Sequence, residues 1–405
     1  MSTSANKAID WDKLVRLFVP GSGIEPPLLA GREEPLKKLA DLIGYLQEDN
    51  SAAPGDAVLF GPRGNGKTVL LNAFGQQSDG KGIDILSLKG KQVSDEVRLA
   101  TYLLRQREVS MKDTEALKLD KGKVGLNFVS GELSRMNRED RETYITTHLF
   151  DLLAARCRNR PLLMIIDEAH TLDFETGGLL LNTSQAVRET GAPFLLVLAG
   201  TPNLRDHLDL MSATFWDRAE IISVGRLDTA ATRAALSEPL KDFGISVEHE
   251  ALETVGVESQ RYPYFIQAWG KALCLTLRDR QATHIDTELV DAARPVFAER
   301  RTDYYEKRYE ELTRQNLLEP AKAVSAMFQD TDLIDSEVLQ ENLVAALSPD
   351  LQGALDMLRK LSHLGFIWKP PASIYYEPGI PSLMGYVLTG RGELSGDGKS
   401  ANSVE

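Results

Sequence analysis

A glycine-rich run of eight residues has the residue types that bind phosphate: Gly61-Pro62-Arg63-Gly64-Asn65-Gly66-Lys67-Thr68. Its glycines let successive backbone N–H groups turn toward one point, and a helix that begins there adds positive dipole character. Lys67 can then reach the outer phosphates of a nucleotide, and the Thr68 hydroxyl can bind the Mg²⁺ that bridges them. The pattern predicts a site for ATP or ADP with Mg²⁺, and the alternative is a glycine-rich turn without a ligand.

The residues that flank this run are those that a phosphate loop requires. Residues 57–60 are apolar and predict a short buried strand that leads into the loop. Residues 69–74 predict the first turns of a helix that leads out of it. We therefore expect Val69 to join the eight loop residues at the nucleotide.

Two acidic residues, Asp167 and Glu168, directly follow the continuous apolar run 162–166. Such a run is typical of a buried parallel strand, which we expect to lie beside strand 57–60. Asp167 would hold the Mg²⁺, usually through water, and Glu168 would polarise the water that attacks the γ-phosphate. The alternative is that both acids are exposed and cap a helix. His170 has no second metal-type ligand at a useful spacing, so we interpret it as structural.

A third polar position follows the next apolar run, residues 194–198. A polar side chain at the end of that strand would lie between the two carboxylates and the γ-phosphate. Thr201 is the first candidate for a residue that senses this phosphate, and Asn203 is the second. A plain turn at the end of the strand is the alternative.

Arg218 lies in residues 215–219, which we expect to close a helix, and precedes a predicted strand at 220–224. An arginine there would face outward from its own nucleotide. It could then stabilise charge on the γ-phosphate of a neighbouring subunit. A salt bridge with Asp217 or Glu220 is an equally open interpretation.

Strands alternate with helices up to about residue 226, which predicts a doubly wound α/β fold with a parallel sheet. From Asp228 the pattern indicates helices only. Three further helices and a hairpin follow between Leu317 and Thr389, which is the order of a winged helix. We therefore expect an N-terminal linker (1–30), an αβα P-loop domain (31–226), a helical lid (227–305), a winged-helix domain (306–390) and a disordered tail (391–405).

The composition of the 405 residues limits the partners, because the formal net charge is −13. A dedicated nucleic-acid binder usually has a basic balance, so any contact with DNA must be local. The one locally basic part is residues 89–123, with nine Lys or Arg against six acids, and a solvated face is its favoured interpretation. The sequence has no apolar run long enough to span a membrane, and Cys157 and Cys274 lie in apolar helical patterns, where we expect buried thiols. These features favour a cytoplasmic location.

Several of these motifs occur in an order that resembles an AAA+ ATPase. They are Gly31-Arg32-Glu33, the phosphate loop, IIDEAH at 165–170, AGTP at 199–202 and FWDRAEII at 215–222. The most similar group contains the origin-recognition initiators and the signalling STAND ATPases. Residues 261–267 resemble the lid segment that these relatives write as Gly-Tyr-Pro-Tyr-Phe, and the resemblance extends from Gly31 to Thr389.

The resemblance implies further roles for residues of the chain. Arg32 would lie near the adenine, and Tyr262 and Pro263 would close over the base from the lid. Arg261 stands where relatives usually carry glycine, and a contact with the phosphates is one role open to it. The initiators also use the region after the second strand to contact DNA, which corresponds to the basic residues 89–123.

We therefore expect an ATPase switch that forms a homo-oligomer and acts on a protein partner or on DNA. The first hypothesis is a nucleotide-gated assembly on DNA or on a DNA-associated partner. The second is a signalling or defence switch of the STAND type, whose partner is a protein. A P-loop kinase is a third interpretation, which the expected lid and winged helix disfavour.

Overall fold

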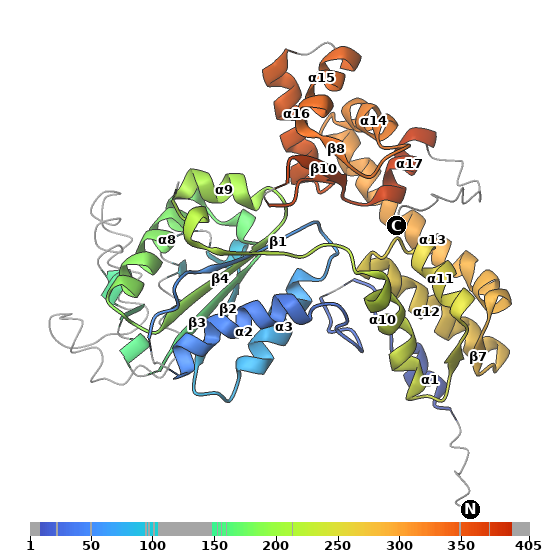
Figure 1. The fold of residues 1–405 in the computed structure, drawn as a ribbon, viewed down its shortest axis with the longest axis horizontal. Coiled ribbons are helices and arrows are strands. Elements are labelled where there is room, and N and C mark those ends of the chain that lie inside the picture. The colour runs from blue at the N-terminus through green and yellow to red at the C-terminus, as the bar shows by residue number, and fades with distance from the viewer. Residues whose placement is uncertain are drawn as a thin grey trace, which may run out of the picture.

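The computed structural model describes residues 9–390, apart from 22, 49–50, 94, 96–97, 100–101, 104–147, 152, 155, 159, 213, 348–349 and 372. Most of the basic stretch 89–123 and all of the tail 391–405 lie outside the described residues. The sequence also predicts a strand or hairpin near 124–131 and a helix at 132–158, and most of these residues lie outside the described part of the chain as well. Three groups of elements follow one another along the chain (Figure 1).

The first group is built on a five-stranded sheet in the order β2-β3-β4-β1-β5, with every described pairing parallel. This confirms the α/β fold with a parallel sheet. The strands are β1 (Ala57–Phe60), β2 (Asp84–Lys89), β3 (Leu162–Asp167), β4 (Phe194–Gly200) and β5 (Glu220–Ser223).

The order of the strands corrects one expectation. We predicted that the strand before Asp167 lies beside the strand before the phosphate loop, but β4 lies between β3 and β1. Residue Val197 of β4 is paired with Ala57 on one side and with Ile165 on the other. All three strands are apolar and buried, so their sequences carry no signal for which two are neighbours.

Helices cover both faces of the sheet, because successive strand residues point to opposite sides. Leu59, Leu163 and Val197 pack with one set of helices, and Val58, Met164 and Leu198 pack with the other. The first face carries α2 (Glu33–Glu48) and α3 (Lys67–Ser78), and the second carries α8 (Phe174–Glu189) and α9 (Leu204–Met211). Short 3₁₀ turns occur at Gly90–Val93, Ala169–Thr171 and Trp216–Arg218.

The second group, which we call the lid, is helical as predicted. It contains α10 (Thr229–Lys241), α11 (His249–Glu258), α12 (Pro263–Arg280), α13 (Thr287–Arg314) and the short strands β6 (Ser246–Val247) and β7 (His284–Ile285). The N-terminal helix α1 (Trp11–Val15) packs on α12, and Leu14 and Phe18 are fully buried in the lid core. Cys274 is buried in the same core, and Cys157 is buried on the second face of the sheet.

The third group follows α13, which runs without a break across the expected domain boundary at 305–306. Its elements are α14 (Leu318–Met327), β8 (Ile334–Asp335), α15 (Ser336–Leu347), α16 (Leu351–His363), β9 (Ile367–Trp368), β10 (Tyr375–Pro378) and α17 (Pro381–Thr389). Three helices and a hairpin thus occur in the predicted order, with β8 and α17 in addition. We call this group the C-terminal unit.

The C-terminal unit lies against the sheet domain (Figure 1). The ring of Trp368 in β9 lies 6.0 Å from that of Phe60, the last residue of β1. Arg226, between β5 and α10, lies 3.9 Å from Asp332. The hairpin therefore lies next to the loop that follows β1.

No helix in the described part of the chain is long and apolar enough to cross a membrane.

Candidate functional site

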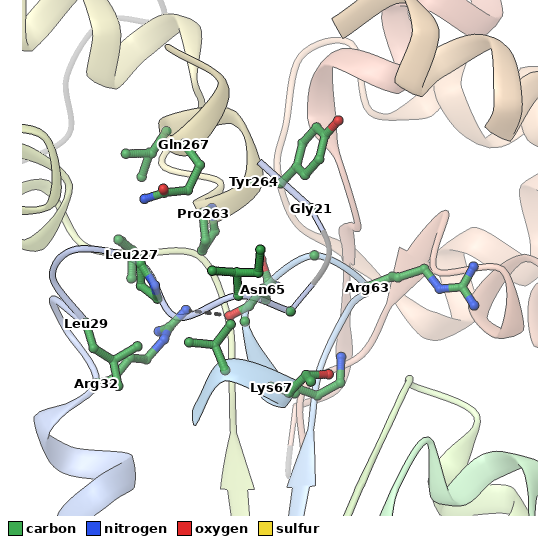
Figure 2. Close-up of a pocket in the computed structure, with 18 of the residues that line it drawn as sticks. Gly21, Leu29, Arg32, Arg63, Asn65, Lys67, Leu227, Pro263, Tyr264 and Gln267 are labelled. Atoms are coloured by element: carbon green, nitrogen blue, oxygen red, sulfur yellow. Dashed lines mark hydrogen bonds between the residues drawn. The ribbon is translucent and has the colours of Figure 1, made fainter. Parts of the chain in front are cut away.

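A cavity of about 270 Å³ lies where the sheet domain, the lid and the N-terminal segment meet (Figure 2). Its floor consists of the phosphate loop and the ends of β3 and β4. Its other walls are α12 and a segment that consists of residues 19–21 and 23–30, which we call the N-terminal strap. The residues that line the cavity include Leu29, Arg32, Lys67, Thr68, Asp167, Glu168, His170, Thr201, Leu227, Pro263 and Gln267.

The phosphate loop has the backbone conformation that its glycines permit. Gly64 and Gly66 both have a φ of +86°, in the left-handed region that favours glycine. Gly66 is the N-cap of α3, so the first backbone N–H groups of this helix point toward the cavity floor. The Lys67 ammonium donates hydrogen bonds to the carbonyls of Gly61 (2.7 Å) and Pro62 (2.8 Å). Burial lowers the pKa of Lys67 to about 8, and a phosphate group beside it would favour the charged form.

The proposed metal-binding residues lie together. The Thr68 hydroxyl donates a hydrogen bond to Asp167 Oδ2 at 2.6 Å, and the other oxygen of this carboxylate accepts from the Glu168 backbone N–H at 2.9 Å. A hydroxyl and one carboxylate beside a phosphate loop fit Mg²⁺, which keeps several waters and takes its remaining ligands from phosphate. No cluster of three or more His, Cys, Asp or Glu that could hold a metal occurs among the described residues.

Glu168 lines the cavity because the chain turns sharply after β3. Its φ of +53° is left-handed, and its carbonyl accepts hydrogen bonds from the Thr171 backbone N–H (2.8 Å) and hydroxyl (2.7 Å). Neither Asp167 nor Glu168 caps the following long helix α8, because Asp173 does so through the N–H groups of Glu175 and Thr176. The pair is thus positioned beside Thr68 rather than used as a cap.

His170 is a cavity residue that sequence reasoning set aside. Its Nδ1 is buried and has no hydrogen-bond partner in the part of the chain that the structure describes. Burial, together with the charges of Lys67 and Arg63, lowers its pKa to about 4. The imidazole is therefore neutral at pH 7. Only its position two residues after Glu168 could have suggested that it lies in the site.

Thr201 lies at the end of β4, between the strand that leads to the phosphate loop and the strand that ends at Asp167. It is 7% exposed, lines the cavity, and its hydroxyl donates a hydrogen bond to Asn203 Oδ1 at 2.5 Å. Asn203 does not line the cavity but orients the Thr201 hydroxyl. The two candidates for the phosphate-sensing position thus contact each other.

Arg218 does not end a helix, since α9 ends at Met211 and Trp216–Arg218 form a separate 3₁₀ turn. Its guanidinium donates to the Thr214 carbonyl (3.0 Å) and hydroxyl (3.1 Å), and it does not line the cavity. Neither Asp217 nor Glu220 forms an ion pair with it within the described chain, and Glu220 instead pairs with Lys38 at 3.1 Å. A role for Arg218 toward a neighbouring subunit stays a prediction.

Arg32 lines the cavity but uses its guanidinium to join segments of backbone. It donates to the carbonyls of Asn65 (3.0 Å) and Gly225 (2.7 Å), and it is 6% exposed. Burial lowers its pKa to about 10, so it stays charged at pH 7. Arg32 therefore fixes the strap to the phosphate loop and to the segment that leads into the lid.

Tyr262 and Pro263 take different positions at the start of α12. Pro263 lines the cavity, whereas Tyr262 is fully buried and donates a hydrogen bond to the Arg63 carbonyl on the loop. A Cβ added at Gly64 would lie 2.1 Å from the Tyr262 hydroxyl oxygen, so this glycine permits the contact. Arg261 has a left-handed φ of +56°, the conformation that favours the glycine of relatives, and it does not line the cavity.

The N-terminal strap is the part of the site that sequence reasoning missed. Val19, Ile24 and Leu29 line the cavity, although Pro20–Gly23 and Pro26-Pro27 prevent regular structure there. Gly23 lies against the phosphate loop, where an added Cβ would be 3.1 Å from the Thr68 methyl carbon. The apolar residues that lie among these prolines were the sequence signal that could have indicated a cavity wall here.

Residues 28–198 match the family model of an AAA ATPase domain. The Walker-type ATPase PABY2304 of Pyrococcus abyssi is a similar solved structure, with 17% identity, a TM-score of 0.56, and coverage of 88% of this chain and 95% of that one. The ORC2 protein of Aeropyrum pernix, solved in ADPNP-ADP complexes, has 13% identity, a TM-score of 0.54, and coverage of 94% of this chain and 98% of that one. At these identities the likeness shows a shared fold. No curated protein matches the chain.

Proposed function

We propose that this chain, whose residues 28–198 match the family model of an AAA ATPase domain, is an ATP-hydrolysing switch that transmits its nucleotide state to the C-terminal unit. The observation that supports this most is the composition of the cavity wall. Residues of the sheet domain, the strap and the lid all line one cavity of about 270 Å³. A nucleotide that binds there contacts all three and favours one arrangement of them.

The residues at the loop end of the cavity fit Mg²⁺-dependent hydrolysis. Lys67 would exchange its two carbonyl partners for the outer phosphates, and Thr68 and Asp167 would hold Mg²⁺, which neutralises developing charge there. Glu168 would orient and polarise the attacking water, and Thr201 would contact the γ-phosphate. These roles agree with the positions of the five residues around one space.

Two contacts would carry the nucleotide state outward. The Tyr262 hydroxyl joins the lid to the Arg63 carbonyl of the phosphate loop, and it lies 3.3 Å from the Tyr304 hydroxyl of α13. α13 continues into the C-terminal unit, whose Gly365 lies close to the Arg63 backbone nitrogen. A movement of the loop upon phosphate binding would therefore change contacts of both the lid and the C-terminal unit.

The output that we propose is a nucleotide-gated homo-oligomeric assembly on DNA or on a DNA-associated partner. The winged-helix order of the C-terminal unit and the basic stretch 89–123 support it. The chain repels phosphate backbones elsewhere, so binding should be weak, enhanced by ATP and lost when Lys118, Lys121 and Lys123 become Glu.

A second candidate, a switch of the STAND type that acts on a protein, is favoured by one observation. Trp368 of the hairpin is only 6% exposed, and it packs against Phe60 and beside Gly225. The third helix of the unit, α16, offers only the basic side chains of Arg359 and Lys360 for a contact with DNA. The Arg359 guanidinium already forms an ion pair with the Asp356 carboxylate at 3.6 Å. An internally packed hairpin and a partly neutralised helix suit a protein partner better than DNA.

Two measurements test these proposals. Hydrogen exchange of β9 and α16 should differ between ATP and ADP in the parent and not in Lys67→Ala, and identical exchange in all states would exclude the switch. Fluorescence anisotropy with labelled DNA should then show ATP-enhanced binding that the triple Glu variant loses. The matched control converts the exposed residues Lys37, Lys81 and Lys307 to Glu, which changes the net charge equally. Absence of DNA binding in every nucleotide state would favour the protein-partnered switch.

A further inference from the structure

Gln267 is a cavity residue for which neither the motifs nor the hydrolysis mechanism supplies a role. It lies on α12 directly after Ile266 and four residues after Pro263, so the side chains of Pro263 and Gln267 lie on the same side of the helix. All three line the cavity. Figure 2 shows Gln267 at the lid end of the cavity, far from Lys67 at the loop end.

The carboxamide of Gln267 has an unsatisfied acceptor. Its Oε1 is buried and has no hydrogen-bond partner among the residues that the structure describes. The side chains around this end are mainly apolar and form a small cluster of Ala30, Leu227, Ala231, Ala235 and Ile266. A buried polar atom in such surroundings is costly unless a donor reaches it. The cavity lies beside it, so a ligand can supply that donor.

The guanidinium near this end is already engaged. Arg32, which the family resemblance places near the base, donates its guanidinium hydrogens to the carbonyls of Asn65 and Gly225. The other unpartnered atoms of the cavity wall, Asn65 Oδ1 and His170 Nδ1, belong to the phosphate loop and to the turn after β3. Gln267 is therefore the group best placed to distinguish one base from another.

The shape and chemistry of this end define the group that it would take. Apolar walls from Leu29, Leu227, Pro263 and Ile266 suit the faces of a flat aromatic ring. A buried acceptor at the edge of the ring requires an N–H donor, and the exocyclic amine of adenine is such a donor.

We propose that Gln267 accepts a hydrogen bond from the exocyclic amine of adenine and so determines the preference for ATP over triphosphates that lack this amine. The inference rests on the proposed ATP site and adds a residue that selects the base. A site built around a hydrogen bond rejects the analogue that cannot form it, because its buried polar group is then left unpaired.

The test compares ATP with purine riboside triphosphate, which differs from ATP only by the absence of the amine. Isothermal titration calorimetry on the full chain gives the dissociation constant of each. The parent should bind ATP about tenfold more tightly, the effect of one net hydrogen bond. Gln267→Met, which keeps the length of the side chain and removes the acceptor, should bind both nucleotides with equal affinity. Gln267→Glu keeps an acceptor and should keep the preference for ATP.

Three outcomes would overturn the inference. The parent could bind the two nucleotides equally, or Gln267→Met could keep the full tenfold preference, which would assign the selection to another group. If Gln267→Met binds both nucleotides more weakly by the same factor, the role of Gln267 is purely structural, and thermal unfolding of the variant would confirm this. If the parent binds neither triphosphate, the proposed function itself is wrong, and this result differs from all the others.

Discussion

Gly270→Ala should detach the N-terminal strap from the lid. Gly270 lies on α12, and an added Cβ would lie 2.5 Å from both Cγ and Cδ1 of the Phe18 ring. Phe18 is fully buried in the lid core, so its ring cannot turn into open space. The residue that follows, Val19, is the first of the strap residues that line the cavity. One methyl group would therefore displace the anchor of a cavity wall.

The magnitude follows from two opposing terms. Insertion of a methyl group into a packed core costs about 1–3 kcal/mol. Replacement of glycine by alanine within a helix recovers about 0.5–1 kcal/mol. The two terms combine to about 0–2.5 kcal/mol, so we expect Gly270→Ala to lower the free energy of unfolding by about 1 kcal/mol. We also expect a weaker affinity for ATP, because the strap would no longer be held against the lid.

Urea unfolding followed by circular dichroism measures the first effect, and calorimetry with ATP measures the second. Gly44→Ala is the matched control, since Gly44 lies in α2 with nothing within 4 Å of an added Cβ. The control should raise the free energy of unfolding by about 0.5–1 kcal/mol and leave ATP binding unchanged. If Gly270→Ala is as stable as Gly44→Ala and binds ATP like the parent, the anchoring role of Phe18 is refuted.

Three further predictions concern the ATPase reaction. Lys67→Ala removes the cation that reaches the phosphates and should weaken ATP binding about 10- to 100-fold by calorimetry, so unchanged binding would contradict the site. Glu168→Gln should still bind ATP but hydrolyse it about 100- to 10,000-fold more slowly, and an unchanged rate of phosphate release would exclude Glu168 as the base. Arg218→Ala should lose hydrolysis and regain part of it when mixed with Lys67→Ala, since one variant keeps the pocket and the other keeps the arginine. Absence of recovery in proven mixed assemblies would favour a structural role for Arg218.

Local sequence patterns were sufficient to predict most elements. The five strands, among them one that we expected at residues 83–88, were predicted within one to two residues at their ends. The central strands β1, β3 and β4 could be recognised because buried parallel strands are continuous apolar runs. The helical character of the lid was also predicted, although α13 extends to Arg314, beyond the predicted lid boundary at residue 305. The phosphate loop could be recognised because its chemistry depends on backbone conformation, and glycine is the residue that permits that conformation.

The arrangement of these elements in space could not be predicted from local sequence patterns. The position of β4 between β1 and β3 depends on which apolar strands pair, and all of them have equivalent sequences. The 3₁₀ turn at Trp216–Arg218 stands where a helix end was expected, and only the packing of that segment determines it. The packing of Trp368 against Phe60 likewise joins residues more than 300 positions apart.

The sequence by itself determined that a phosphate loop, two carboxylates and a lid segment exist in this chain, because each is a short motif whose residue types carry the chemistry. Only the tertiary structure decided what completes the cavity around them. Arg32, predicted to lie near the adenine, joins three backbone segments. Gln267, to which the lid segment assigned no role, has a buried acceptor at the lid end. The reason is physical: the role of a side chain depends on whether its hydrogen bonds are already satisfied, and partners distant in sequence decide that.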